Sequence, residues 1–190
     1  MTTLNAIWER IEAWYEAQGA LAQLQPGATE EQIAALEAFL GYPVSDDLRA
    51  SLRRHDGTVD GGWPTGTLLG TAASQDEATV WRELLDGGDF DGNTDHDASA
   101  GREQVERGWW SHGWVPLDAD GGGNGAVVDM TPGPAGSMGQ VLDMDHEAGP
   151  SGPQHDTLAG YLEEIAEKLE SGEYVVADGG VYAADEVEDE

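Results

Sequence analysis

Hydrophobic side chains recur every three or four residues in five stretches of the chain, which is the spacing of helices that bury one face. In the first stretch these residues are Leu4, Ile7, Trp8, Ile11 and either Trp14 or Tyr15. The same spacing predicts helices over residues 4–17, 30–40, 45–54, 75–85 and 158–170. Each of them has a single apolar stripe, so all five are expected to pack on a common core.

Capping signals indicate where these helices begin and end. Thr29 and Gln32 are spaced as a capping box, in which each side chain bonds the other residue's backbone N–H. The run 74–77, Ser-Gln-Asp-Glu, has the same pattern and predicts the start of the fourth helix. Gly41 and Gly57 follow the second and third helices, where a left-handed residue ends a helix at low cost.

Shorter apolar runs bounded by glycine and proline are typical of strands. They predict strands over residues 67–69, 114–117, 126–130 and 140–142, and a hairpin formed by residues 174–177 and 181–182. Residues 121–125 are expected to be a turn and 149–153 a loop. This order predicts a single α+β domain over residues 1–182, with a central, mostly antiparallel sheet and helices packed on one face. The acidic residues 183–190 are expected to form a disordered tail.

The charge is strongly unbalanced, with 38 acidic residues against 8 basic ones and a net charge of −30. Such a chain is a poor ligand for nucleic acid, because phosphates are bound by neutralising Lys and Arg. A cationic partner would be attracted over long range. The alternative is that the acidic surface serves only solubility. No cysteine is present, which excludes disulfides and thiolate metal sites.

The first residues, Met-Thr-Thr-Leu-Asn, carry neither a basic region nor an apolar region of a secretory signal. No window approaches the length of apolar residues that a membrane helix needs. We therefore expect a cytoplasmic protein without a membrane partner, and a monomer rather than an oligomer. No cofactor motif is visible, so none is expected.

The stretch 86–101 is rich in aspartate and is expected to be a solvated, variable loop. Asp89, Asp91 and Asn93 match the opening of a calcium-binding loop. The glycine and glutamate that such a loop needs at its sixth and twelfth positions are absent. The five histidines also lack a zinc spacing, so the sequence predicts no metal site.

Two further groups of residues invite a catalytic interpretation. Asp143, Asp145 and Glu147 alternate, which would place three carboxylates on one face of an extended segment, where they would raise one another's pKa or help to bind a cation. The alternative, which we favour, is an exposed edge strand whose charges discourage aggregation. His55 and Asp56 resemble a catalytic pair, but no nucleophile is marked nearby, and a structural turn is the preferred interpretation.

The most specific pattern lies within residues 109–141. Its ordered residues are Trp110, Gly113, Trp114, Pro116, Gly121, Gly122, Gly123, Asp129, Pro132, Gly133, Gly136, Gly139, Gln140 and Val141. In this order they resemble the Smi1/Knr4 family, also called the SUKH superfamily. A second stretch, from Pro26 to Gly41, is also similar to the family.

The resemblance implies a single-domain α+β binding protein rather than an enzyme. Many bacterial members are immunity proteins that neutralise a toxin domain, and fungal members regulate cell-wall synthesis. Together with the acidic charge, this leads us to expect a bacterial immunity protein that occludes the active site of a basic toxin domain. The alternative is a regulatory or scaffold protein of the Smi1/Knr4 type, and a carboxylate-based enzyme or calcium-binding protein is a third hypothesis.

Candidate partner-binding residues are aromatic side chains, which would supply affinity, and carboxylates, which would raise the association rate. They lie in the loop after residue 60, in the aspartate-rich loop and around the central hairpin. These candidates are Trp63, Asp89, Asp91, Asp95, Trp110, Asp118, Asp120 and Asn124.

Overall fold

The structure of the protein is a computed structural model, which describes residues 3–92, 103–106 and 108–187. Its helices are α1 (Leu4–Ala17), the 3-10 helix η1 (Leu21–Gln23), α2 (Glu30–Leu40), α3 (Asp46–Arg54), α4 (Thr71–Gly87), α5 (Leu158–Ser171) and α6 (Ala184–Val187). Its strands are β1 (Thr67–Leu68), β2 (Trp114–Pro116), β3 (Asp118–Ala119), β4 (Gly125–Asp129), β5 (Gln140–Asp145), β6 (Gly149–His155), β7 (Tyr174–Ala177) and β8 (Gly180–Ala183).

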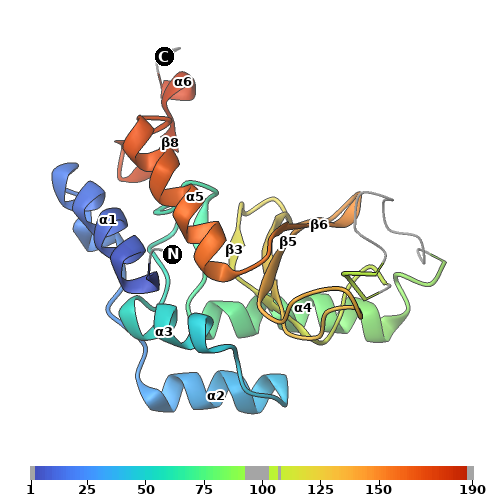
Figure 1. Ribbon diagram of the computed structural model, residues 1–190. Helices are drawn as coiled ribbons and strands as arrows, with labels where there is room; N and C mark the ends of the chain where they lie inside the picture. Colours follow the sequence, from blue (N-terminus) through green and yellow to red (C-terminus); the bar gives the residue numbers. More distant parts are fainter. Residues whose placement is uncertain (1–2, 93–102, 107, 188–190) are drawn as a thin grey trace.

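The central sheet has the strand order β2-β4-β5-β6, and every neighbouring pair is antiparallel. Two small antiparallel pairs, β1-β3 and β7-β8, flank it. Helices and antiparallel sheets in one domain confirm the predicted α+β class. Helices α1, α3 and α5 gather beside one another, whereas α4 runs along the strands at another side of the sheet (Figure 1).

Both faces of the central sheet are buried. Successive residues of a strand point to opposite faces, and β4 shows the consequence. Val128 packs in the large cluster that includes Leu162 of α5, while Val127 packs with Trp81 of α4 and Leu142 of β5. The structure thus adds α4 to the face opposite α5, which explains why β4 is apolar at consecutive positions.

The predicted helix ends are mostly confirmed. Thr29 and Gln32 form the capping box, and Gly41 ends α2 with φ +86°. Gly57 does have a positive φ, +81°, but His55 is the C-cap of α3, so Gly57 does not end that helix. Its glycine identity serves packing instead, because an added Cβ would lie 2.5 Å from the backbone nitrogen of Gly70.

The predicted start of α4 is wrong. The helix begins at Thr71, whose backbone N–H donates to Asp56 Oδ1 over 2.5 Å. Ser74 is therefore inside the helix, where it is buried and donates to the Pro116 carbonyl rather than capping. The stripe predicted for this helix is displaced as well, since Val80 is 54% exposed. The tertiary contact to Asp56 overrides the local capping pattern.

Three other expectations differ from the structure. Residues 149–153 are part of strand β6 rather than a loop, and its prolines are tolerated because β6 is an edge strand. Strand β5 is central, so the interpretation of its aspartates as charges on an edge strand is wrong. Ala184–Val187 forms the helical turn α6, where a disordered tail was expected. In the part of the chain that the structure describes, no helix is long and apolar enough to cross a bilayer.

Candidate functional site

A buried carboxylate, Asp118, joins three segments that are distant in sequence. Its Oδ2 accepts hydrogen bonds from the hydroxyls of Tyr161, over 2.5 Å, and Thr65, over 2.7 Å. Its Oδ1 accepts from the backbone N–H of Ala126 over 2.5 Å. The Trp63 indole N–H donates to the Tyr161 oxygen over 2.8 Å, which extends the network into the core.

This network forms the floor of an acidic hollow of about 300 Å³. The hollow opens between the 61–66 loop, α5, and the ends of β3, β4 and β5. Asp143 and Asp145 are exposed on the face of β5 that they share with buried Val141, while Met144 between them points to the opposite face. The charged and polar residues that line it are Thr65, Asp118, Asp120, Asn124, Asp143, Asp145 and Tyr161.

The carboxylates of the hollow differ in their proton affinity. Burial raises the pKa of Asp118, although its three hydrogen bonds oppose the rise. Partial burial also raises the pKa of Asp143, and the negative charge of Asp118 adds to the effect. The backbone N–H groups of Ala148 and Glu147 lower the pKa of Asp145. The hollow thus combines a solvated anionic rim with a floor where negative charge is costly.

The turn between β3 and β4 is held by its own side chains. Burial alone would raise the pKa of Asp120, but hydrogen bonds from the backbone N–H groups of Asn124 and Gly122 lower it. The Asn124 amide also donates to Asp120 Oδ2 over 2.8 Å. Asn124 Oδ1 in turn accepts from the backbone N–H of His146 over 3.2 Å. Asp120 is exposed and fixed in position, as a contact residue on a rim would be.

The structure separates the other predicted site residues. Trp63 and Trp110 are 0% and 3% exposed, so their side chains belong to the core and leave no surface for a partner. Asp89 and Asp91 are exposed just beyond α4, far along the chain from the hollow. Asp95 lies outside the described residues. The hollow therefore unites Asp118, Asp120 and Asn124 and leaves out the remaining candidates.

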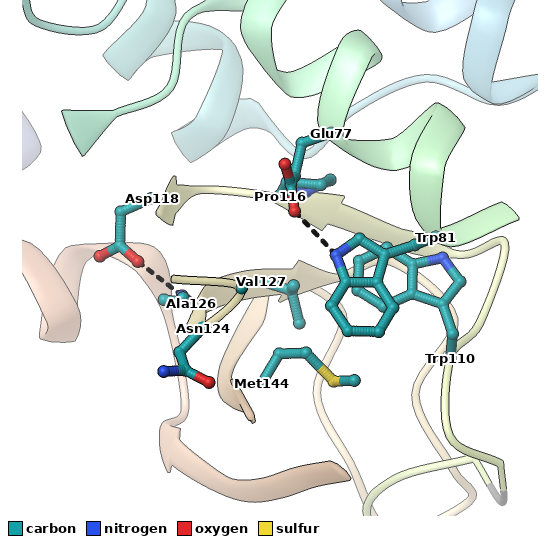
Figure 2. Close-up of a pocket in the computed structure, with 11 residues that line it drawn as sticks. Glu77, Trp81, Trp110, Pro116, Asp118, Asn124, Ala126, Val127 and Met144 are labelled. Carbon is teal, nitrogen blue, oxygen red and sulfur yellow. Dashed lines mark hydrogen bonds between the residues drawn. The ribbon is translucent and has the colours of Figure 1, made fainter. Parts of the chain in front are cut away.

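Trp110 contributes to an aromatic cluster between α4 and the sheet (Figure 2). Its ring stacks on that of Trp81, with centroids 5.0 Å apart and planes 10° from parallel. The Trp81 indole N–H donates to Glu77 Oε1 over 2.8 Å. The cavity beside this stack measures about 10 Å³, which is room for about one water molecule. The cavity on this side of the sheet is therefore too small for a ligand larger than a water molecule.

Sequence reasoning missed Thr65 and Tyr161 as members of the site. Tyr161 belongs to the apolar stripe of α5, and nothing local distinguishes its hydroxyl from that of any core tyrosine. Asp143 and Asp145 were recognised by their alternation, and the structure places both on one face of β5. Glu147 lies in the turn after the strand rather than on that face. Among the described residues, no group of three or more acidic or histidine side chains is placed to hold a metal ion.

An antiparallel α+β domain of this kind is the architecture expected of the SUKH type. The model of the SMI1/KNR4 family (SUKH-1) matches residues 27–170, which include all the residues of the floor. The chain therefore belongs to this family, as its sequence motifs indicated.

Relatives from fungi extend the comparison. The chain is 31% identical, over 89% of its length, to the cell wall biosynthesis/cell cycle regulator smi1 of Schizosaccharomyces pombe. It is 27% identical, again over 89%, to a glucan synthesis regulatory protein of Neurospora crassa. Over 75% of its length it is 24% identical to KNR4/SMI1 homolog 2 of Debaryomyces hansenii. The matches cover 36%, 39% and 31% of these relatives, so the chain spans about a third of their length.

These relatives correct the expected function. They carry the names of regulators of the cell wall or of glucan synthesis, or of the KNR4/SMI1 proteins themselves. The expectation of a bacterial immunity protein is therefore wrong, and so is the basic toxin domain expected as its partner. Acidic charge misled the interpretation, because net charge indicates the sign of a partner and not its biological class.

Proposed function

We propose that this chain is a cytoplasmic, non-enzymatic protein-binding domain that acts in the regulation of cell-wall synthesis. The observation that carries the proposal is the similarity to the fission-yeast regulator, which extends over 89% of the chain. The relatives from Schizosaccharomyces pombe and Neurospora crassa are named as regulators rather than as enzymes.

The geometry supports a binding role. Hydrogen bonds hold Asp120 and Asp145 at the rim, Asp143 adds a third carboxylate there, and the floor below is also held by hydrogen bonds. A rigid surface binds with a smaller loss of conformational entropy than one that must become ordered first. The hollow is therefore the part of the domain that we propose as its contact surface.

The test is a chimera of the fission-yeast protein in which this chain replaces the matching segment. Cells that lack the native regulator would express the chimera, and their resistance to digestion by a β-glucanase would be measured. We expect the chimera to restore resistance toward that of cells with the intact regulator.

A matched control is a second chimera with Leu162→Asp, which places a charge in the core beside α1 and prevents folding. This control should fail to restore resistance. If the first chimera is expressed and folded at the level of the native protein but cells remain as sensitive as the control, the proposed function is refuted.

A further inference from the structure

Beside the acidic hollow lies a second hollow of about 500 Å³. It is bordered by the 61–66 loop, by β7 and β8, and by the start of α6. Its apolar wall consists of Pro64, Tyr174, Val181, Tyr182 and Ala183. Thr65 and Asp120 line both hollows, so the two adjoin at these residues, and together they are called the groove, with an acidic end and an aromatic end.

The aromatic end is open to solvent. The Tyr182 side chain is 42% exposed. Its ring lies over the backbone of Gly180, where an added Cβ would be 2.8 Å from the ring. One face of the Tyr182 ring therefore lies against the Gly180 backbone, and the other face is open to solvent. Tyrosine in such a position provides contact area at small entropic cost.

Charge defines what the groove can accept. Its acidic end carries Asp120, Asp143 and Asp145, and Glu186 stands at the far end. Among the described residues that line either hollow, none is a Lys, an Arg or a His. An anionic segment would be repelled along the whole length, whereas a segment with Lys or Arg would form charge-assisted bonds with the rim and would stack on the tyrosines.

We propose that this groove binds an extended segment of a partner protein in which Lys or Arg residues lie next to an apolar or aromatic residue. The cationic side chains occupy the acidic end, and the apolar side chain packs between Pro64, Tyr174 and Tyr182. This assignment rests on the proposed function, since it names the chemistry of the partner that such a regulatory domain binds.

The probe is a displayed library of short random peptides, selected on the purified full chain at low salt. Enriched sequences would then be synthesised with a fluorescent label and titrated by anisotropy. We expect enriched peptides to combine Lys or Arg with an aliphatic or aromatic residue, and their affinity to fall as salt is added. No enrichment over the starting library, or enrichment of sequences without basic residues, would overturn the proposal.

Two variants locate the binding. Asp143→Asn with Asp145→Asn keeps the side-chain oxygens that accept backbone hydrogen bonds and removes two rim charges; it should weaken binding about tenfold. Tyr182→Ser removes the exposed ring and should weaken binding about fivefold. Binding that neither variant changes would overturn the assignment to this groove.

The matched control is Glu16→Gln with Asp76→Asn, which changes net charge by the same amount at exposed positions on α1 and α4. It should alter affinity less than twofold. An equal loss in this control would show that net charge alone attracts the peptides, which also contradicts the groove.

The chimera described above and the peptide selection together separate the two proposals. Restored resistance with the unaltered chimera, together with peptide selection that fails, would refute the groove and leave the regulatory function standing. Specific peptide binding by a chimera that restores nothing would refute the function and leave the groove.

Discussion

Removing the hydroxyl of Tyr161 should destabilise the domain far more than its small size suggests. The hydroxyl donates to Asp118 and accepts from the Trp63 indole, and the three side chains are 6%, 3% and 0% exposed in that order. Tyr161→Phe therefore deletes a hydrogen bond to a carboxylate and leaves a buried N–H without an acceptor. The ring itself still fits, because only one atom is lost.

The size of the effect follows from these two losses. A hydrogen bond to a charged group contributes about 1.5–3 kcal/mol, and a buried donor without a partner costs about 1–3 kcal/mol. Since one hydroxyl serves both bonds, the two terms overlap, and we expect a loss of about 3 kcal/mol in the free energy of unfolding. For a domain of this length that corresponds to a fall in melting temperature of about 6–12 °C.

Urea denaturation followed by tryptophan fluorescence measures the change. The matched control is Tyr182→Phe, where the same atom is removed from an exposed ring and the expected change is within about 0.5 kcal/mol. Combining Tyr161→Phe with Asp118→Asn should give a coupling energy of about 1 kcal/mol or more, because the two residues are in contact. A loss below about 1 kcal/mol in the single variant, or strict additivity in the pair, would refute the network as a source of stability.

Three other predictions concern pH and packing. Because the pKa of Asp118 is raised in the folded state, its contribution to stability is greatest below its unfolded pKa and declines as pH rises. Denaturation measured from about pH 4 to about pH 7 should therefore show Asp118→Asn gaining stability relative to the parent chain. A difference in stability that stays constant with pH would contradict this. The hydrogen bonds of Arg54 lower the pKa of Glu12, so the contribution of this ion pair to stability is present above the unfolded pKa of Glu12 and is lost as pH falls. Glu12→Gln should lower the free energy of unfolding by about 1–3 kcal/mol at neutral pH. A loss that does not shrink on acidification would be inconsistent with the ion pair. Gly113→Ala should lower stability by about 3 kcal/mol, because the added Cβ would lie 1.8 Å from the Thr131 hydroxyl oxygen. Gly121→Ala, at φ +77° with open space around it, should cost only about 1–2 kcal/mol. Equal melting temperatures for the two variants would count against the packing argument.

Some of the structure was readable from short stretches of sequence. The period of the apolar residues located α1, α2, α3 and α5, and the capping box at Thr29 marked the start of α2 to the residue. These features depend on interactions within a few residues, which a linear pattern records. The ordered motif between residues 109 and 141 identified the family for a related reason, since several of its glycines permit backbone approaches that no other residue allows.

The same reasoning failed where a distant contact outweighed a local signal. Ser74 has a capping pattern, yet Asp56 caps α4 one turn earlier. Trp63 and Trp110 looked equally suited to a core or to an interface, and only their neighbours show that both are buried. The largest error was to predict a toxin partner from the acidic charge, because composition sets the sign of the surface charge but does not identify the partner.

By itself, then, the sequence determined the fold class, most helix boundaries, the family and the acidic character of the surface. Only the tertiary structure decided that Asp118 meets Thr65 and Tyr161, which lie 53 and 43 positions away along the chain. It also decided that the hollow lined by the β5 aspartates adjoins the hollow lined by the tyrosines of β7 and β8. The physical reason is that helical and strand periods are set by local backbone geometry, whereas a binding groove is set by which distant segments the packed core brings together.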